Sequence, residues 1–395
     1  MIMPDMTNID LWAKQGVTYD VIFKSLDVGI HPINWVREDV LKEMYDNYMI
    51  RACYSKCGNY YKVNYGNIMF RDFQNYQFLF FCRGDVLRVD SNIIVAKAPN
   101  KFWNIDENIY TKSDSLCWNS PQNNVVEKMD GMMILPYKND DGEWKLTSRG
   151  SFEYEVIPIA EKYFTQNYID FCEECLRFKQ YPVFEIISKE SFIKVEYPED
   201  KHGLYFLGCS NIDGNISRPK SDFKTAKKYG IKTPEIYDLT TKEQIYNFVN
   251  SHEHYYDFEG VVFYTFRGAV KIKSTKYCEM NIQKLDNIES LYEMWNENEI
   301  DDVLPHLPPI QVETIIQNIQ KFKTHKNYLN EEYAKISPDL EKLKDIKDVV
   351  EYIQNNCDSK YFHFFLNKYK NNPIIVEKSR KHLTLAHIKE LEKLK

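Results

Sequence analysis

The chain has 395 residues, 43% of them hydrophobic and 15% aromatic, and a formal net charge of -7. This composition can build a substantial core, which excludes an intrinsically disordered chain, and the length predicts two or three domains. The acidic total charge does not by itself indicate a nucleic-acid binder, although a local groove can be basic on an acidic protein. Nine cysteines scattered along the chain indicate reduced thiols in a cytoplasm rather than a disulfide framework. No apolar run reaches membrane-spanning length, so we expect no membrane segment.

The first half of the chain is predicted to change from helix to short strands. Residues 37–45 have a helical pattern, and runs rich in Tyr, Phe and Val between residues 60 and 90, such as Gln77–Phe81, predict strands. Asn139–Gly142 predicts the turn of a hairpin that joins residues 132–137 to residues 144–147. Residues 159–179 predict a helix with Tyr163, Tyr168, Phe171 and Cys175 at its apolar positions.

After Met280 the pattern becomes helical, with few strand signals. The predicted helices cover residues 291–297, 310–323, 329–335, 349–355 and 381–394, and prolines lie between several of them. We therefore expect two domains, residues 1–282 with an N-terminal extension over about the first 55, and an α-helical C-terminal domain over residues 283–395.

The tetrapeptide Lys128-Met129-Asp130-Gly131 lies between two apolar runs that predict strands. Lysine is protonated at neutral pH, and it attacks phosphorus only when desolvation and nearby positive charge favour the free amine. Asp130 follows Lys128 at strand spacing, which predicts that both side chains face one pocket. Gly131 would let the backbone approach a nucleotide closely. Taken alone the motif is weak, because a solvated Lys and Asp at the end of a strand would give the same pattern.

Two lysines and two glutamates downstream suggest a binding site for phosphates. Lys271 and Lys273 alternate along one predicted strand, and such neighbours repel unless anionic oxygens lie between them; the alternative is an exposed edge strand protected by charge. Glu185 and Glu259 lie in apolar strand contexts, where a carboxylate is costly unless it is paired or binds a metal. Salt bridges at strand ends are the alternative for both.

These elements belong to an ordered series of motifs. The series is Phe81-Cys82-Arg83-Gly84, Asn100-Lys101-Phe102-Trp103-Asn104, the tetrapeptide at Lys128, Thr147-Ser148-Arg149-Gly150-Ser151, Val183-Phe184-Glu185-Ile186-Ile187, Phe258-Glu259-Gly260-Val261-Val262, and Val270-Lys271-Ile272-Lys273-Ser274 followed by Tyr277. It resembles the covalent nucleotidyltransferase superfamily, which includes ATP-dependent DNA and RNA ligases and mRNA capping enzymes. The first two motifs make it most similar to the RNA ligase 1 family, the bacteriophage tRNA-repair type, from about Gly58 to about Met280.

The resemblance implies a fold and a set of roles. The fold would be α+β, a nucleotidyltransferase (ATP-grasp-like ligase adenylation) core of antiparallel sheets over residues 1–282, with an all-α C-terminal domain. Lys128 would be the nucleophile, helped by Lys271 and Lys273. Glu259 and Glu185 would hold Mg²⁺, with Mn²⁺ as an alternative. The residues implied to contact ATP are Arg83, Lys101, Asp130, Gly131, Arg149, Glu185, Lys271, Lys273 and Tyr277. Arg149 stands where the family usually has lysine, and the segment around Lys194 departs from the family pattern.

The implied activity is ATP-dependent RNA ligation through a lysyl-AMP and an RNA-adenylate, which joins a 5′-phosphate to a 3′-hydroxyl. The partner would be RNA, a tRNA with a broken anticodon loop by family resemblance, with a polynucleotide kinase-phosphatase acting upstream. We expect the protein to be a monomer in the cytoplasm, which would be the cytoplasm of the host cell if the protein comes from a virus. Two alternatives stay open: a DNA ligase or capping guanylyltransferase, which would carry a β-rich OB-fold after the last motif, and a non-catalytic nucleic-acid end-binding protein.

Overall fold

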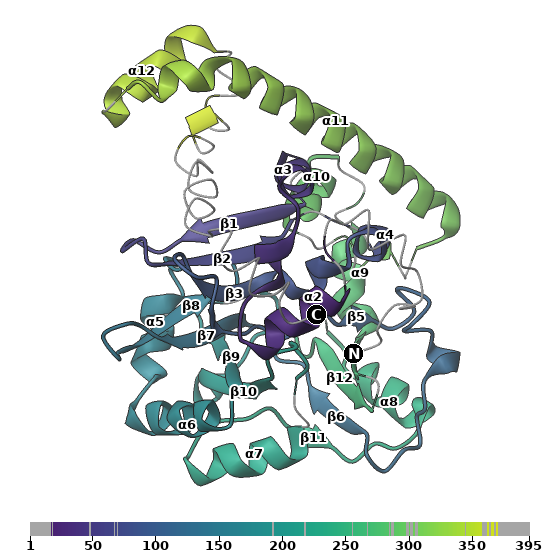
Figure 1. The fold of residues 1–395 in the computed structure, drawn as a ribbon. Helices are drawn as coiled ribbons and strands as arrows, with labels where there is room; N and C mark the ends of the chain where they lie inside the picture. The colour runs from purple at the N-terminus through teal and green to yellow at the C-terminus, as the bar shows by residue number, and fades with distance from the viewer. Residues whose placement is uncertain are drawn as a thin grey trace.

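The fold is described from a computed structural model (Figure 1). The described residues run from 17 to 369, except for residues 18, 47–48, 67, 69, 192, 217–218, 255, 267, 284, 286–287, 298–299, 301–302, 305–306, 344, 358–361, 363–364 and 367–368. Three β-sheets form the centre, and helices cover them. Within the described ranges, no helix is both long and apolar enough to cross a membrane.

The first sheet has the strand order β1-β2-β3-β4, and all its pairs are antiparallel. Its strands and the helices beside it are α2 (Tyr19–Asp27), η1 (Pro32–Trp35), α3 (Glu38–Asp46), β1 (Ile50–Tyr54), β2 (Tyr60–Tyr65), α4 (Phe70–Asn75), η2 (Gln77–Phe81), β3 (Arg83–Arg88) and β4 (Ile94–Ala96). Gln77–Phe81 is a 3-10 helix, so the predicted strand there is wrong. Phe78 and Leu79 are fully buried in the core that joins α2 and α3 to this sheet.

The second sheet has the order β10-β9-β7-β8 and is also antiparallel. Its elements are β7 (Met132–Lys138), β8 (Trp144–Ser148), α5 (Ile157–Tyr163), α6 (Gln166–Arg177), β9 (Tyr181–Ile187), η4 (Glu199–Lys201), β10 (Gly203–Ser210) and α7 (Pro219–Lys228). The hairpin predicted at Asn139–Gly142 is confirmed, with Gly142 at φ +81°. The helix predicted over residues 159–179 is instead two helices, α5 and α6, which break at Phe164 and Thr165.

The third sheet has the order β11-β6-β12-β13-β5, and only the β13–β5 pair is parallel. Its elements, with the helices beside them, are β5 (Trp103–Asn104), η3 (Ser113–Ser115), β6 (Asn124–Glu127), β11 (Ile236–Tyr237), α8 (Lys242–Val249), β12 (Gly260–Thr265) and β13 (Gly268–Lys273). Val261, Phe263, Val270 and Ile272 are buried against α8. The opposite strand face therefore points toward the second sheet, and it carries Val262, Lys271 and Lys273.

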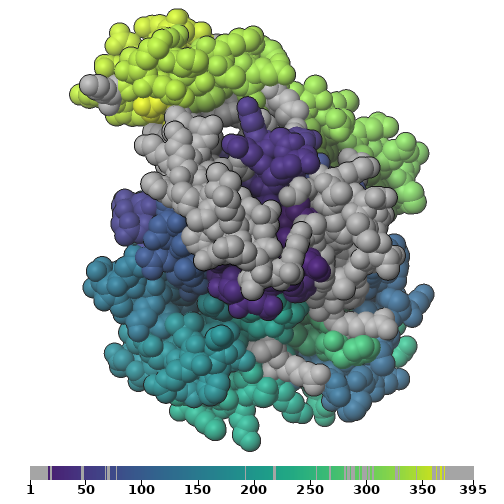
Figure 2. Space-filling view, viewed as in Figure 1, coloured from purple at the N-terminus to yellow at the C-terminus, as the bar shows by residue number. Residues whose placement is uncertain are grey.

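The C-terminal part consists of helices α9 (Thr275–Gln283), α10 (Ile288–Glu297), α11 (Pro309–Leu340) and α12 (Ile346–Asn356). The described residues after Gln283 contain no strand. The helices predicted over 310–323 and 329–335 are one continuous helix, α11, which ends just after Pro338. Figure 2 shows α11 and α12, in green and yellow, at one end of the face in view. The helix predicted over residues 381–394 lies outside the described residues.

Candidate active site

A cavity of about 630 Å³ lies between the second and third sheets and brings together most of the predicted site residues. Those among its lining residues are Arg83, Lys101, Lys128, Gly131, Arg149, Glu185, Lys271 and Lys273. They come from the five motifs upstream of Glu259 and from β13, so the fold gathers motifs that are far apart in the sequence. A volume of this size is typical of a pocket for a small molecule.

Lys128 lies in the loop between β6 and β7, at the floor of this cavity. Its Nζ is 2.6 Å from Glu259 Oε2, and the other carboxylate oxygen of Glu259 is 3.0 Å from Lys273 Nζ. Burial opposes ionisation of Glu259, but the charges of Lys128 and Lys273 outweigh burial and hold its pKa below its ordinary value. The Lys128 Nζ must leave this contact with Glu259 before it can attack phosphorus, which requires a free amine.

Glu185 is the second buried carboxyl at this end of the cavity. It lies on β9, and its Oε1 accepts a hydrogen bond of 3.3 Å from the Gly131 N–H. The pKa of Glu185 is raised to about 8, mainly by burial and also by the nearby Glu259 and Asp130, although Lys128 opposes the shift. A buried carboxyl whose negative charge is only partly balanced by neighbouring positive charge is a suitable ligand for a cation.

Asp130 does not share the cavity with Lys128, because residues 128–130 are irregular and do not continue the strand. Its Oδ2 accepts hydrogen bonds from the backbone N–H groups of Lys194 (2.9 Å) and Val195 (2.8 Å), and its Oδ1 accepts one of 2.9 Å from the hydroxyl of Tyr277. Neither Asp130 nor Tyr277 lines the cavity. Asp130 thus anchors α9 and the 194–195 segment to the Lys128 loop, and a contact of either residue with nucleotide stays a prediction.

Gly131 is required by close packing of two strands. A Cβ at this position would lie 2.3 Å from the carbonyl oxygen of Ile186 and 3.0 Å from Cγ of Glu185. Gly84, at φ +98°, is under the same constraint, because a Cβ there would lie 2.5 Å from the carbonyl oxygen of Arg149. The missing side chain of Gly131 lets the Lys128 loop pack against the strand of Glu185. The missing side chain of Gly84 likewise lets the start of β3, with Arg83, pack against Arg149.

Four cations gather around Tyr65 in the same cavity. Burial alone would raise the pKa of Tyr65, but the positive charges of Lys101, Arg83, Arg149 and Lys271 outweigh it and lower the pKa. Lys101 Nζ lies 4.2 Å from the centroid of the Trp103 ring, and Lys271 Nζ lies 5.9 Å from that of Phe102. Among the described residues that line the cavity, the carboxylates are those of Glu127 and Glu185. This end of the cavity suits a polyanion.

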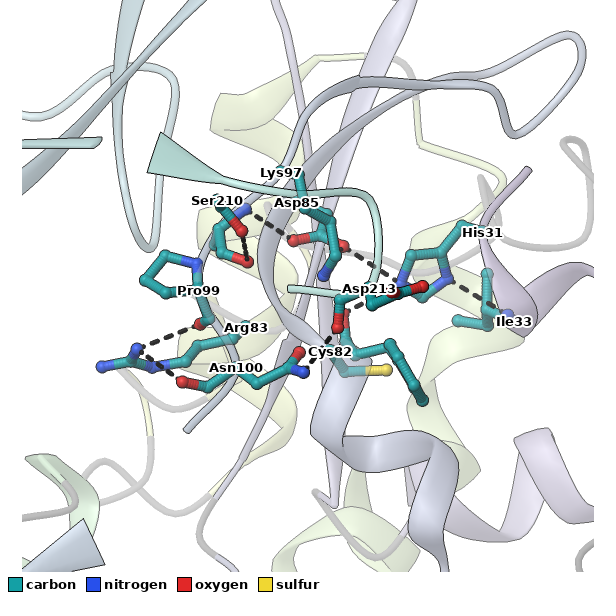
Figure 3. Close-up of polar contacts among 12 residues, drawn as sticks. His31, Ile33, Cys82, Arg83, Asp85, Lys97, Pro99, Asn100, Ser210 and Asp213 are labelled. Atoms are coloured by element: carbon teal, nitrogen blue, oxygen red, sulfur yellow. Dashed lines mark hydrogen bonds and ion pairs between the residues drawn. The ribbon is translucent and has the colours of Figure 1, made fainter. Parts of the chain in front are cut away.

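Arg83 is hydrogen-bonded to the backbone of the two residues that precede Lys101. Its guanidinium donates to the carbonyl oxygens of Pro99 (3.0 Å) and Asn100 (3.2 Å), while the Asn100 amide donates to the carbonyl oxygen of Asp213 (Figure 3). Its Nε has no partner in the described part of the protein, which leaves a donor for a ligand.

A fully buried charged cluster lies next to Arg83 (Figure 3). Asp85, two residues further along β3, is 2.7 Å from Lys97 Nζ and accepts a hydrogen bond of 2.9 Å from the Ala98 N–H. His31 Nε2 lies 2.9 Å from the Phe81 carbonyl oxygen, to which it donates, because its Nδ1 accepts from the Ile33 N–H. The cluster therefore ties the N-terminal segment to β3, which carries Arg83, and to the segment after β4 that leads to Lys101.

Acidification is predicted to weaken the fold through His31. Burial lowers the pKa of His31 from 6.5 to about 4, with Asp85 opposing and Lys97 reinforcing that shift. Between pH 6.5 and 4 the unfolded chain holds a proton that the folded protein lacks, so stability falls as the pH is lowered, by roughly 3 kcal/mol in total. Urea unfolding at pH 4, 5 and 6.5 should show a shallower dependence in His31→Gln, while His254→Gln, at an exposed position, should match the wild type. Identical pH dependences in all three proteins would contradict this role.

Sequence reasoning missed three residues of this region. Tyr65 lines the cavity, whereas Asp85 and Lys97 form a buried ion pair outside its lining. A signal was present for Lys97, which is a single charge in the apolar stretch from Ile93 to Pro99, whereas Asp85 lies between Arg83 and Arg88 and does not stand out in the sequence. Among the residues that the structure describes, no group of three His, Cys, Asp or Glu side chains is arranged to hold a metal.

Comparison with known families identifies the chain. A family model described as RNA ligase matches residues 81–277, the stretch that contains every residue of the cavity named above except Tyr65. Over these residues the chain belongs to the RNA ligase family. The nucleotidyltransferase-type α+β fold of antiparallel sheets that the motifs predicted agrees with this assignment.

Solved structures of RNA ligases are also similar to this member of the RNA ligase family. An archaeal ATP-dependent RNA ligase is 12% identical, covers 76% of this chain and 79% of its own length, and has a TM-score of 0.48. A Naegleria gruberi RNA ligase with PPi is 20% identical over 47% of this chain and 58% of its own, with a TM-score of 0.36. A mutant of that ligase with ATP and Mn is 22% identical over 41% and 52%, with a TM-score of 0.33. No curated protein matches the chain.

Proposed function

We propose that the protein is an ATP-dependent RNA ligase with Lys128 as its nucleophile. The observation that carries the proposal is the combination of groups at the cavity: Lys128, Glu185 and Lys273 line it beside the buried Glu259, and the charges of four cations act on Tyr65, which lines it as well. A nucleoside triphosphate in this cavity would have its α-phosphorus near Lys128 and its outer phosphates near Arg83, Lys101 and Lys271. The family match to RNA ligases supports this reading.

The first step would be displacement at the α-phosphorus. Lys128 Nζ forms a P–N bond while the bond to the β-phosphate oxygen breaks, so pyrophosphate leaves on the side opposite Lys128. Lys271 and Lys273 would stabilise the charge on the α-phosphate, and Arg83 and Lys101 the charge that develops on the leaving group. AMP then passes to the 5′-phosphate of an RNA end, and a 3′-hydroxyl displaces AMP to join the strands.

A divalent cation fits beside the two buried glutamates. Glu185, with its raised pKa, and Glu259, ionised and buried, are the carboxyls that would hold it. Oxygen ligands near substrate phosphates are those that Mg²⁺ prefers, and Mn²⁺ accepts the same set. When bound, the ion would neutralise phosphate charge. Lys273, on the other oxygen of Glu259, would keep that carboxylate oriented when Lys128 moves away from it.

The experiment that tests the proposal is label transfer to the protein. Incubation with α-labelled ATP should give a protein that carries the label through an acid-labile P–N bond, and α-labelled GTP should give little. A labelled protein that then passes its label to a 5′-phosphorylated oligoribonucleotide supports a ligase. Label from GTP in place of ATP would favour a capping guanylyltransferase. An OB-fold, which a DNA ligase or capping enzyme would add, has no counterpart in the described residues after Gln283, all of whose elements are helices.

We further propose that the natural substrate is a tRNA with a broken anticodon loop, supplied by a polynucleotide kinase-phosphatase that prepares the ends, and that the enzyme acts as a cytoplasmic monomer. The support is the motif series together with the helical C-terminal part. Two basic runs there would contact phosphates. Residues 321–326 lie on α11, whereas residues 378–382 lie outside the described residues.

Neutralising the α11 run is predicted to affect tRNA selectively. Lys321→Gln with Lys323→Gln should lower sealing of a nicked anticodon loop several-fold and leave sealing of a short unstructured RNA unchanged, because only a folded RNA reaches from the active site to this helix. Phosphate contacts also predict that rising salt reduces the difference.

The matched control for that double variant is Lys335→Gln, an exposed lysine on the same helix. Equal activity of the double variant and the wild type on both RNAs would remove the tRNA claim and leave a general RNA ligase. Faster sealing of DNA ends than of RNA ends would overturn the RNA assignment, since the 2′-hydroxyl is the feature by which proteins distinguish the two.

A further inference from the structure

A second cavity, of about 330 Å³, continues the first one. Five residues line both cavities and form the wall between them: Pro99, Lys101, Phe102, Ile216 and Tyr264. Lys101 is the only cation in this wall. A ligand that passes the wall is therefore in reach of the positive charge that serves the first cavity.

The floor of the second cavity is the next row of the third sheet. In the first cavity, Val126, Val262 and Lys271 are cross-strand neighbours on β6, β12 and β13. Two residues along each strand, Asn124, Tyr264 and Ala269 form the corresponding row, and all three line the second cavity. Alternate residues share one face of a sheet, so the two floors form one surface whose rows are about 7 Å apart.

The lining of the second cavity combines aromatic rings with side-chain amides, and none of its described residues carries a carboxylate. The rings are those of Phe80, Phe102, Trp103, Tyr110, Tyr264 and Phe266, and the amides are those of Asn100, Gln122, Asn124 and Asn215. Phe266 follows directly after β12 and is 56% exposed, so its ring is accessible to a ligand. Flat rings beside hydrogen-bonding amides are the surroundings that a nucleobase prefers.

Asn124 provides a specific, buried polar group. The residue is 9% exposed, and its Nδ2 donates a hydrogen bond of 3.0 Å to the carbonyl oxygen of Gln122. Its Oδ1 is buried and has no hydrogen-bond donor among the described residues. A buried acceptor without a donor is destabilising, and a ligand N–H group would satisfy it.

Under the proposed function, the geometry of AMP transfer from Lys128 to RNA indicates which nucleotide would occupy the second cavity. A 5′-phosphate oxygen must attack the phosphorus of the lysyl-AMP in line, from the side opposite Lys128. A P–O bond forms, the P–N bond breaks, and the electron pair returns to Lys128 Nζ, which takes up a proton. The attacking phosphate therefore occupies the side from which pyrophosphate left, beside Lys101, and its own nucleoside lies beyond Lys101.

We propose that the second cavity binds the 5′-terminal nucleoside of the RNA strand that receives AMP, with its base between the rings and an exocyclic N–H donating to Asn124. This proposal rests on the proposed function, because it assumes a lysyl-AMP at Lys128. It assigns to this cavity the selection of the donor strand, a task separate from ATP binding.

The test compares Phe266→Ala and Gln122→Ala with the wild type at separate steps. Both variants should acquire label from ATP as the wild type does, since neither residue lines the first cavity. Transfer of AMP to a 5′-phosphorylated oligoribonucleotide should show a KM for the oligonucleotide raised about tenfold for Phe266→Ala, because stacking on one aromatic ring contributes roughly 1–3 kcal/mol per base. Phe178→Ala, at another exposed phenylalanine, which caps the C-terminal end of α6, is the matched control.

A donor whose 5′-terminal residue has a phosphate but no base makes the test specific. The wild type should handle this abasic donor as poorly as Phe266→Ala handles the normal one, and Phe266→Ala should lose nothing further on it. An unchanged KM, or an equal loss on both donors, would overturn the proposal. A variant that is impaired only in the KM for the 3′-hydroxyl strand, measured with pre-adenylated donor, would assign the cavity to the other strand instead. Absence of label in the wild type would refute the proposed function and is a separate result.

Discussion

Replacing Lys128 with alanine should abolish transfer of label from ATP to the protein and abolish sealing of unadenylated RNA. The variant lacks the amine that forms the P–N bond, and no other lysine of the cavity takes its place: Lys273 is bound to Glu259, and Lys101 and Lys271 lie over aromatic rings. The fold should survive. Glu259 keeps Lys273 as a partner after Lys128 is truncated, so the buried carboxylate is not left without a counter-charge.

Three measurements separate this outcome from a general loss of function. Sealing of a pre-adenylated donor should persist in part, because that step does not use the nucleophile. The urea midpoint should be close to that of the wild type. Lys138→Ala removes a lysine with a similar ion-pair distance, 2.7 Å to Glu173, from a site outside the cavity, and it should keep full labelling. Label on the Lys128→Ala protein would show that another residue is the nucleophile.

Local patterns in the sequence were sufficient for elements whose side chains repeat on one face. The β7–β8 hairpin and the alternation of Lys271 and Lys273 along β13 are confirmed, because turn chemistry and a period of two depend only on neighbouring residues. Gln77–Phe81 was mistaken for a strand since its aromatic run is typical of β-structure, yet tertiary burial of Phe78 and Leu79 determines a 3-10 turn there.

Helix boundaries were less predictable for the same reason. The break between α5 and α6 at Phe164 and Thr165 has no Gly or Pro to mark it, and the continuity of α11 depends on two separate apolar clusters, around Trp295 and around Tyr333, that its two ends join. Such features are set by what a helix packs against, which the local sequence does not contain.

The sequence predicts which residues belong to the candidate site, but it does not predict the contacts between them. Motif order selected most of the cavity, but the contact between Lys128 and Glu259 spans 131 positions, and no spacing rule predicts it. Asp130 shows the limit most clearly. Its place in the motif suggested a group facing the nucleotide, whereas its carboxylate is engaged by Lys194, Val195 and Tyr277, a role that needs three distant segments to be in place.

Replacing Asp85 with asparagine should destabilise the protein by roughly 3–5 kcal/mol, the usual cost of removing one partner from a buried ion pair. Both side chains of the Asp85–Lys97 pair are fully buried, and the substitution leaves the ammonium group of Lys97 without its counter-charge. Because Asp85 follows Arg83 on β3 and Lys97 begins the segment that reaches Lys101, the KM for ATP in label transfer should also rise. Urea unfolding and the ATP dependence of labelling measure the two effects.

The double variant Asp85→Leu with Lys97→Met distinguishes charge from packing. Apolar residues of similar size can replace a buried ion pair at little cost, so the double variant should recover most of the lost stability. Asp39→Asn is the matched control, because it removes an aspartate from an ion pair of 2.6 Å with Arg37 that is exposed to solvent, where such pairs contribute little. If the double variant unfolds as easily as Asp85→Asn, the hydrogen bond from Ala98 to Asp85, rather than the charge of Lys97, is what holds β3 against the Lys101 segment. If instead the double variant recovers its stability but keeps the raised KM for ATP, Asp85 positions Arg83 and Lys101 directly, independently of its contribution to stability.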